Sequence, residues 1–100
     1  MITRITTYQI RADKLAEIEA AVQAFVAAIA ENEPRTWYAA YRTDEPYTYF
    51  HIMGFPDAEA ESRHQKAPHT LEFVEALYPN CEVQPRFTDL ELIRSASSDS

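Results

Sequence analysis

Residues 37–55 read WYAAYRTDEPYTYFHIMGF, and this stretch carries the pattern from which the fold is predicted. Its two halves, residues 37–43 and 47–55, are rich in aromatic and β-branched residues, which is typical of strands. The short polar connection between them contains Pro46 and predicts a hairpin. Since side chains alternate along a strand, one face of the second strand is predicted to carry Tyr49, His51, Met53 and Phe55.

Further signals on both sides of this hairpin complete a β-α-β-β-α-β order. Residues 2–11 and 83–93 are predicted as the first and last strands. Between the first strand and the hairpin, a helix is predicted from apolar residues at helical spacing, with Asp13 as its N-terminal cap. Those residues are Leu15, Ile18, Val22, Phe25, Val26 and Ile29. The order predicts one α+β domain over residues 1–94, a ferredoxin-like fold with a four-stranded antiparallel sheet.

Residues 57–78 are predicted as a second helical region, with Asp57 as its cap. Pro68 lacks a backbone donor, so a kink or two abutting helices are expected there. The buried side of this region is predicted to comprise Ala60, His64, Ala67, Leu71, Val74 and Tyr78. Along the last strand the apolar phase slips between Phe87 and Leu90, which predicts a bulge or a change of neighbouring strand. Residues 95–100 have no apolar anchor and are predicted to be a disordered tail.

Both faces of the predicted sheet carry apolar side chains. On the second of these two strands, Phe50 and Ile52 point to the other face from Tyr49, His51, Met53 and Phe55. On the first, Trp37 and Tyr41 point to the other face from Tyr38. Two helices can cover only one face of a four-stranded sheet, so the other face would be an exposed apolar patch in a monomer. We therefore expect a homodimer through the sheet face. A moderately sticky monomer is the alternative.

The net charge of -7 argues against nucleic acid or an anionic membrane as a partner, because both require a positive surface. The nine basic residues form no run. Cys81 is the only cysteine, which excludes an internal disulfide and a cysteine-based zinc site. Neither a signal peptide nor a membrane-spanning segment is recognised, so the simplest expectation is a cytoplasmic protein.

A set of residues in the second half of the chain forms a recognisable pattern: Tyr49-Phe50-His51-Ile52-Met53-Gly54-Phe55, Asp57, Ala60-Glu61, His64, Pro68-His69, Phe73 and Leu77. With this pattern the chain resembles the antibiotic biosynthesis monooxygenase family, over about residues 2–93. It implies the dimeric α/β-barrel form of the ferredoxin-like fold. It also implies oxidation of a small aromatic or quinol-like molecule by O₂, with neither metal nor flavin as a cofactor.

His64 is the candidate catalytic base, because it interrupts an otherwise apolar side of the helix. The ordinary pKa of an imidazole, about 6.5, suits proton transfer at neutral pH. The alternative is a core histidine with a hydrogen-bond partner. Substrate-binding candidates, which could equally be core or interface residues, are His51, Trp37, Tyr41, Tyr49 and Phe55. His69 follows His64 by five residues, which turns it away on a continuous helix, so no metal site is predicted.

Two other functions are consistent with parts of this pattern. A haem-degrading enzyme of the same fold would need a helical histidine as iron ligand, and Val74 stands near that position. The sequence therefore lacks the histidine that would bind the haem iron, which argues against this function. A non-catalytic dimer that binds a hydrophobic small molecule, or serves as an accessory protein, stays open as the alternative to the oxygenase.

Overall fold

The computed structural model describes residues 1–96 and confirms the predicted order of elements. The elements are β1 Ile2–Ile10, α1 Leu15–Asn32, β2 Trp37–Arg42, β3 Thr48–Phe55, α2 Ala58–Lys66, α3 Pro68–Leu77 and β4 Cys81–Leu90. Short 3₁₀ turns precede α1 at Ala12–Lys14 and β4 at Tyr78–Asn80. Among the described residues, no helix has the length and hydropathy needed to cross a membrane. Most of the predicted tail, residues 97–100, lies outside the described part.

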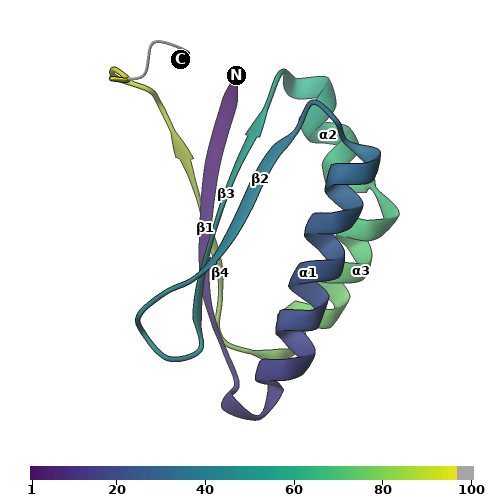
Figure 1. Ribbon diagram of the computed structural model, residues 1–100, viewed down its shortest axis with the longest axis vertical. Coiled ribbons are helices and arrows are strands. Elements are labelled where there is room, and N and C mark those ends of the chain that lie inside the picture. Colours follow the sequence, from purple (N-terminus) through teal and green to yellow (C-terminus); the bar gives the residue numbers. More distant parts are fainter. Residues whose placement is uncertain (97–100) are drawn as a thin grey trace.

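The four strands form one antiparallel sheet in the order β2-β3-β1-β4. All three helices lie against the same face of this sheet (Figure 1). The register aligns Tyr38 with Met53 and Thr6 with His51, so these four side chains point toward the helices. The opposite face is left uncovered by the described chain (Figure 1).

The prediction of a bulge or a change of neighbouring strand between Phe87 and Leu90 is wrong. That segment pairs regularly with β1, from Thr3 opposite Leu90 to Thr7 opposite Arg86. The register shifts instead fall between Arg86 and Cys81. Pro85 lies in this stretch and has no backbone N–H to donate, which interrupts the ladder on an edge strand where such breaks are tolerated.

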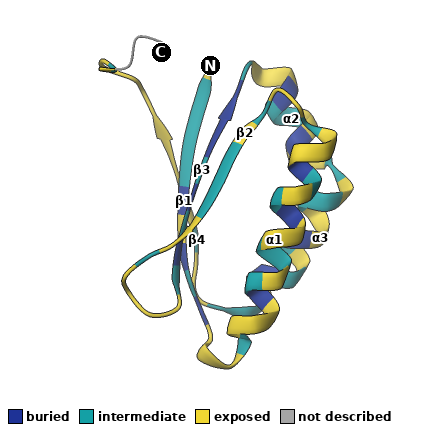
Figure 2. Cartoon of the chain, viewed as in Figure 1, coloured by how far each residue is buried: buried dark blue, intermediate teal, exposed yellow. Residues whose placement is uncertain are grey.

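The core forms where one side of α1 packs on β1, β3 and α3. Ile18, Phe25 and Ile29 are buried on α1, and the exposed residues of this helix face away from the sheet (Figure 2). The rings of Phe25 and Phe73 stack with their centroids 4.4 Å apart. The apolar spacing in the sequence therefore predicted this interface correctly for α1, except that Leu15 is 41% exposed.

The second helical region is two helices, as Pro68 predicted. Ala67 is extended, with ψ 144°, and Pro68 begins α3. The prediction that Leu71 is buried is wrong, because 53% of its surface is exposed. The break resets the helical phase, and it is Phe73 and Leu77 that face the core.

The two predicted caps have opposite outcomes. Asp57 caps α2, since its Oδ1 accepts a hydrogen bond from the Ala60 backbone N–H at 2.8 Å. Asp13 does not cap α1. It lies within the 3₁₀ turn, which the backbone closes from Lys14 to Arg11, and its carboxylate contacts Arg11 at 3.2 Å instead.

Replacing Asp57 with Ala should lower the free energy of unfolding by about 1 kcal/mol, because the N–H of Ala60 loses its acceptor. Asp57→Asn should retain most of the stability, since asparagine caps as well as aspartate. Urea unfolding measures both. Asp13→Ala is the matched control and should change stability by less than about 0.5 kcal/mol. An equal loss in Asp13→Ala and Asp57→Ala would contradict the assigned cap.

Candidate functional site

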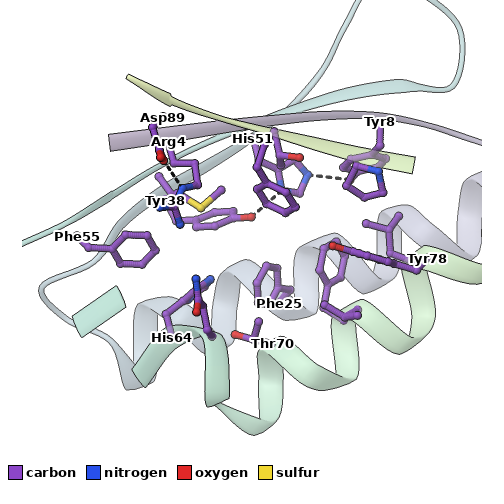
Figure 3. Close-up of a pocket in the computed structure, with 18 residues that line it drawn as sticks. Arg4, Tyr8, Phe25, Tyr38, His51, Phe55, His64, Thr70, Tyr78 and Asp89 are labelled. Atoms are coloured by element: carbon purple, nitrogen blue, oxygen red, sulfur yellow. Dashed lines mark hydrogen bonds and ion pairs between the residues drawn. The ribbon is translucent and has the colours of Figure 1, made fainter. Parts of the chain in front are cut away.

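A cavity of about 500 Å³ lies between the inner face of the sheet and the helices (Figure 3). Its walls are mainly aromatic and aliphatic, with a few polar groups that converge on one space. The sheet contributes Tyr8, Tyr38 and His51, and the helices contribute Phe25 and His64 from the other side. Such a volume and lining are typical of sites for small molecules.

His51 joins two tyrosines on the sheet side of the cavity. Its Nε2 lies 2.8 Å from the hydroxyl of Tyr8, and its Nδ1 lies 2.8 Å from the hydroxyl of Tyr38 (Figure 3). The imidazole has no exposed surface, and burial lowers its pKa to about 4. His51 is therefore neutral at neutral pH, with one N–H and one free lone pair.

The neutral imidazole fixes how the two hydroxyls are used. One tyrosine donates to the unprotonated nitrogen, and the other accepts from the N–H. The accepting hydroxyl keeps its own hydrogen free for a molecule in the cavity. Burial raises the pKa values of Tyr8 and Tyr38, so both side chains stay protonated. The network thus supplies one preorganised O–H donor.

Two threonine hydroxyls in the cavity have no partner in the described protein. The Oγ1 atoms of Thr6 and Thr70 are both buried without a hydrogen bond to residues 1–96. Thr6 lines the cavity from β1, and Thr70 lines it from the first turn of α3. Because buried polar groups are almost always paired, these two hydroxyls are available to water or to a bound molecule.

Glu33, at the end of α1, joins the two helical histidines. His64 Nδ1 lies 2.9 Å from its Oε2, and His69 Nε2 lies 2.5 Å from the same oxygen. Burial opposes ionisation of this carboxyl, but hydrogen bonds from His69 and His64 outweigh it and lower the pKa of Glu33. The expectation that His69 turns away from His64 is wrong, because the break at Pro68 redirects α3.

The far nitrogen of His64 is placed differently. Within residues 1–96, Nε2 has no hydrogen-bond partner, while the residue lines the cavity. The ring centroids of Phe55 and Phe25 lie 5.1 and 5.8 Å from the centroid of the imidazole. His64 therefore presents an acceptor or donor to the cavity while Glu33 holds the other side of the ring.

An ion-pair cluster lies at one end of the cavity. The Nε atom of Arg4 donates to Asp89 at 2.6 Å, and its Nη1 contacts the carboxylate of Glu61. Arg4 and Asp89 both line the cavity. Since one guanidinium meets two carboxylates, this end carries no surplus positive charge that would select an anion.

The structure brings together only some of the substrate-binding candidates. His51 and Phe55 line the cavity with His64. Tyr49 shares their face but lies behind Tyr8, with its hydroxyl donating to Glu19 at 2.8 Å. Burial, followed by this contact with Glu19, raises the pKa of Tyr49 to about 12.

Trp37 and Tyr41 are not part of the cavity. They point to the uncovered face of the sheet, where they are 53% and 54% exposed. The alternation along β2 separates them from Tyr38, which faces the helices.

Several residues of this region were not singled out as site residues from the sequence. Alternation along β1 shows Thr6 and Tyr8 to share the face of Ile10, so their position was recoverable once that face was known. Glu33 gave no such signal, because it stands beside Pro34 at the end of a helix and meets both histidines only through tertiary packing.

Comparisons with known proteins agree with this fold. Residues 1–76 match the family model described as antibiotic biosynthesis monooxygenase. A comparison with curated protein sequences gives no significant match. A solved structure described as an antibiotic biosynthesis monooxygenase superposes with a TM-score of 0.85 at 16% identity, covering 94% of this chain and all of the other.

Two further structures are similar over nearly the whole chain. Rv0793 of Mycobacterium tuberculosis has a TM-score of 0.84 at 18% identity, with 96% of this chain and 98% of that chain covered. A variant of SnoaB, a cofactor-independent oxygenase from Streptomyces nogalater, has a TM-score of 0.77 at 18% identity and 95% coverage of both chains. At these identities the likeness shows the fold alone. The family model, in contrast, covers most of the sequence, and the chain belongs to the antibiotic biosynthesis monooxygenase family.

Proposed function

We propose that this protein is a cofactor-independent monooxygenase that oxidises a small aromatic or quinol-like molecule with O₂ in the cavity between sheet and helices. The observation that carries the proposal is the convergence of His64, the Tyr8–His51–Tyr38 network and two unpaired threonine hydroxyls on an aromatic-walled space of about 500 Å³. Apolar walls supply contact area for a flat molecule, and the polar groups fix its orientation.

The proposed reaction balances without an outside reductant. An activated CH₂ group, or the CH position of a phenol, becomes a carbonyl carbon. One oxygen atom of O₂ enters the product and the other leaves as water. The substrate must first lose a proton, after which its electron-rich anion can transfer an electron to O₂. The protein needs to supply a base, a donor for the oxyanion and a space from which bulk water is excluded.

We assign the base to His64. Glu33 accepts the N–H of its Nδ1, which leaves the lone pair of Nε2 toward the cavity. A carboxylate behind an imidazole fixes its tautomer and orientation, as in other catalytic dyads. The free O–H of the tyrosine network, on the opposite wall, is placed to donate to the substrate oxyanion.

We also propose that the protein acts as a homodimer through the uncovered face of the sheet. Trp37, Tyr41, Val83 and Leu90 project from this face and are each more than 40% exposed. Beyond β4 the chain continues past the sheet (Figure 1), where 72% of Leu92 and essentially all of Ile93 are exposed. A two-fold partner would bury this apolar surface, which a monomer leaves in water.

Replacing His64 with Gln should lower kcat by about 100- to 10,000-fold, because the substrate proton loses its acceptor. The assay is O₂ consumption with a panel of hydroxylated aromatics and anthrone, with ¹⁸O₂ labelling to identify the product. Lys66→Ala, an exposed change on the same helix, is the control and should retain full activity.

Two results would contradict this assignment. Full activity in His64→Gln, with a circular dichroism spectrum like that of the wild type, would exclude the base. Thermal stabilisation by the aromatic panel without any O₂ uptake would favour the non-catalytic binding protein instead.

Acidification should destabilise the protein through His51. The folded pKa is about 4, below the ordinary 6.5, so the unfolded state binds the proton more tightly. The contribution of His51 is present above pH 6.5 and is lost as the pH falls toward 4, by about 3 kcal/mol. Urea unfolding of wild type and His51→Gln between pH 7 and 4 measures it. An unchanged pH slope in the variant would refute this assignment.

The sheet-face dimer is tested by Tyr41→Glu. We expect the dissociation constant to rise at least tenfold, because an ionised carboxylate would be buried in the interface. Light scattering coupled to size exclusion gives the mass over a range of concentrations. Leu71→Glu places the same charge at an equally exposed apolar residue on the helical side, and it should leave the mass unchanged. A monomeric wild type would overturn the proposal.

A further inference from the structure

Glu33, His64 and His69 form a side-chain cluster that the proposed oxidation uses only in part. One oxygen or nitrogen from each residue lies within 4.8 Å of the other two. The three side chains are between 8% and 14% exposed, so the cluster is nearly buried. His69 has no role in the proposed reaction, yet it contacts Glu33 more closely than His64 does.

Two imidazoles and one carboxylate are a donor set for divalent transition metals. Imidazole nitrogen with carboxylate oxygen suits zinc, cobalt, nickel, iron and manganese, whereas calcium and magnesium prefer oxygen alone. Three protein ligands would leave a coordination position for water or another molecule. The donors come from the end of α1, the last turn of α2 and the first turn of α3, so a metal would bind these three helices together.

The three donor atoms are near one another but not yet at the distances of a zinc site. Ligand atoms about 2.0–2.1 Å from a tetrahedral zinc lie about 3.3 Å from one another. The Glu33 oxygen now lies 2.9 Å from His64 Nδ1 and 2.5 Å from His69 Nε2. The carboxylate would need to withdraw by several tenths of an ångström. The two imidazole nitrogens, which lie within 4.8 Å of each other, would need to come to about 3.3 Å by rotation of their side chains.

A second group already orients the carboxylate. The hydroxyl of Thr36 donates to Glu33 Oε1 at 3.0 Å. His64 Nδ1 lies 3.0 Å from the same oxygen, and Oε2 contacts both histidines. Outer partners of this kind hold metal ligands in place. The rings of Phe25 and Tyr38 pack near His64 and form an apolar shell on the side of the cavity.

The cluster also has an entry path. Glu33 and His69 line an outer cleft of about 560 Å³, separate from the cavity that His64 lines. The two arginines of this cleft are paired with carboxylates, which reduces their repulsion of an entering cation. Arg63 pairs with Glu59 at 2.6 Å, and Arg35 lies 3.6 Å from Asp57.

We propose that Glu33, His64 and His69 form a binding site for one divalent transition metal of the zinc type, reached from the outer cleft. The metal would take the lone pairs of His64 Nδ1 and His69 Nε2 in place of their hydrogen bonds to Glu33.

A metal at this site would change the protonation of His64, whose Nδ1 would bind the metal while its Nε2 faces the cavity. With metal on Nδ1, a neutral imidazole carries its proton on Nε2, so His64 would donate to the cavity and no longer accept. Metal binding is then expected to inhibit the oxidation, a consequence that rests on the proposed function. The metal site itself does not depend on that function and is tested without substrate.

The test is titration of the metal-free protein with Co²⁺ and Zn²⁺. We expect one Co²⁺ per chain with visible absorption bands, displaced by Zn²⁺. The chain holds only three histidines. Zinc should therefore shift the imidazole ¹⁵N signals of His64 and His69 and leave those of His51 in place. Absence of the bands, or a shift confined to His51, would overturn the proposal without any variant.

Variants locate the site. His69→Gln and Glu33→Gln should weaken Co²⁺ binding by more than the about 10- to 100-fold expected for Thr36→Val, which removes only the outer partner. Glu31→Gln removes the same charge at an exposed position on α1 and should bind normally. Equal Co²⁺ affinity in His69→Gln and the wild type would place the metal elsewhere and refute the site. In turnover assays, zinc inhibition should disappear in His69→Gln.

Discussion

The missing backbone N–H of Pro68 is the constraint on which the helical layer depends. It prevents residues 57–78 from forming one helix, and Ala67 becomes an extended joint between α2 and α3. On a continuous helix, His64 and His69 would point about 140° apart. The joint instead lets both reach one carboxylate, and it turns Phe73 and Leu77 onto the core. The cavity lies between the helices so placed and the sheet.

The two walls of the cavity handle polarity in different ways. On the sheet side, His51 is fully buried and neutral, and two tyrosine hydroxyls satisfy both ring nitrogens without any buried charge. On the helix side, the Glu33 carboxylate is next to the outer cleft and accepts from Thr36, His64 and His69. An ionised group costs less there, because it accepts several hydrogen bonds. Charge is thus kept at the boundary and away from the apolar interior.

Local pattern predicted the elements, and tertiary contacts decided the site. Alternation along β3 predicted correctly that His51 and Phe55 share a face, and apolar spacing predicted the buried side of α1. Alternation separates Trp37 and Tyr41 from Tyr38, but it does not say which of these two faces of β2 meets the helices and the cavity. The hairpin register, which aligns Tyr38 with Met53, decides which face of β2 meets the helices. Glu33 was unpredictable, because no spacing connects it to residues more than thirty positions away.

The unpaired hydroxyls of Thr6 and Thr70 support the proposal that the cavity holds a hydroxylated aromatic molecule. A buried hydroxyl without a partner costs about 1–3 kcal/mol, and valine has nearly the same shape without that cost. A cavity meant only to be filled by side chains would gain stability from apolar residues at both positions. Because the two threonines face one space from opposite layers, a single molecule with polar groups at both ends could satisfy both. A hydroxylated aromatic molecule has that distribution: an apolar ring for the walls and oxygens at its edge.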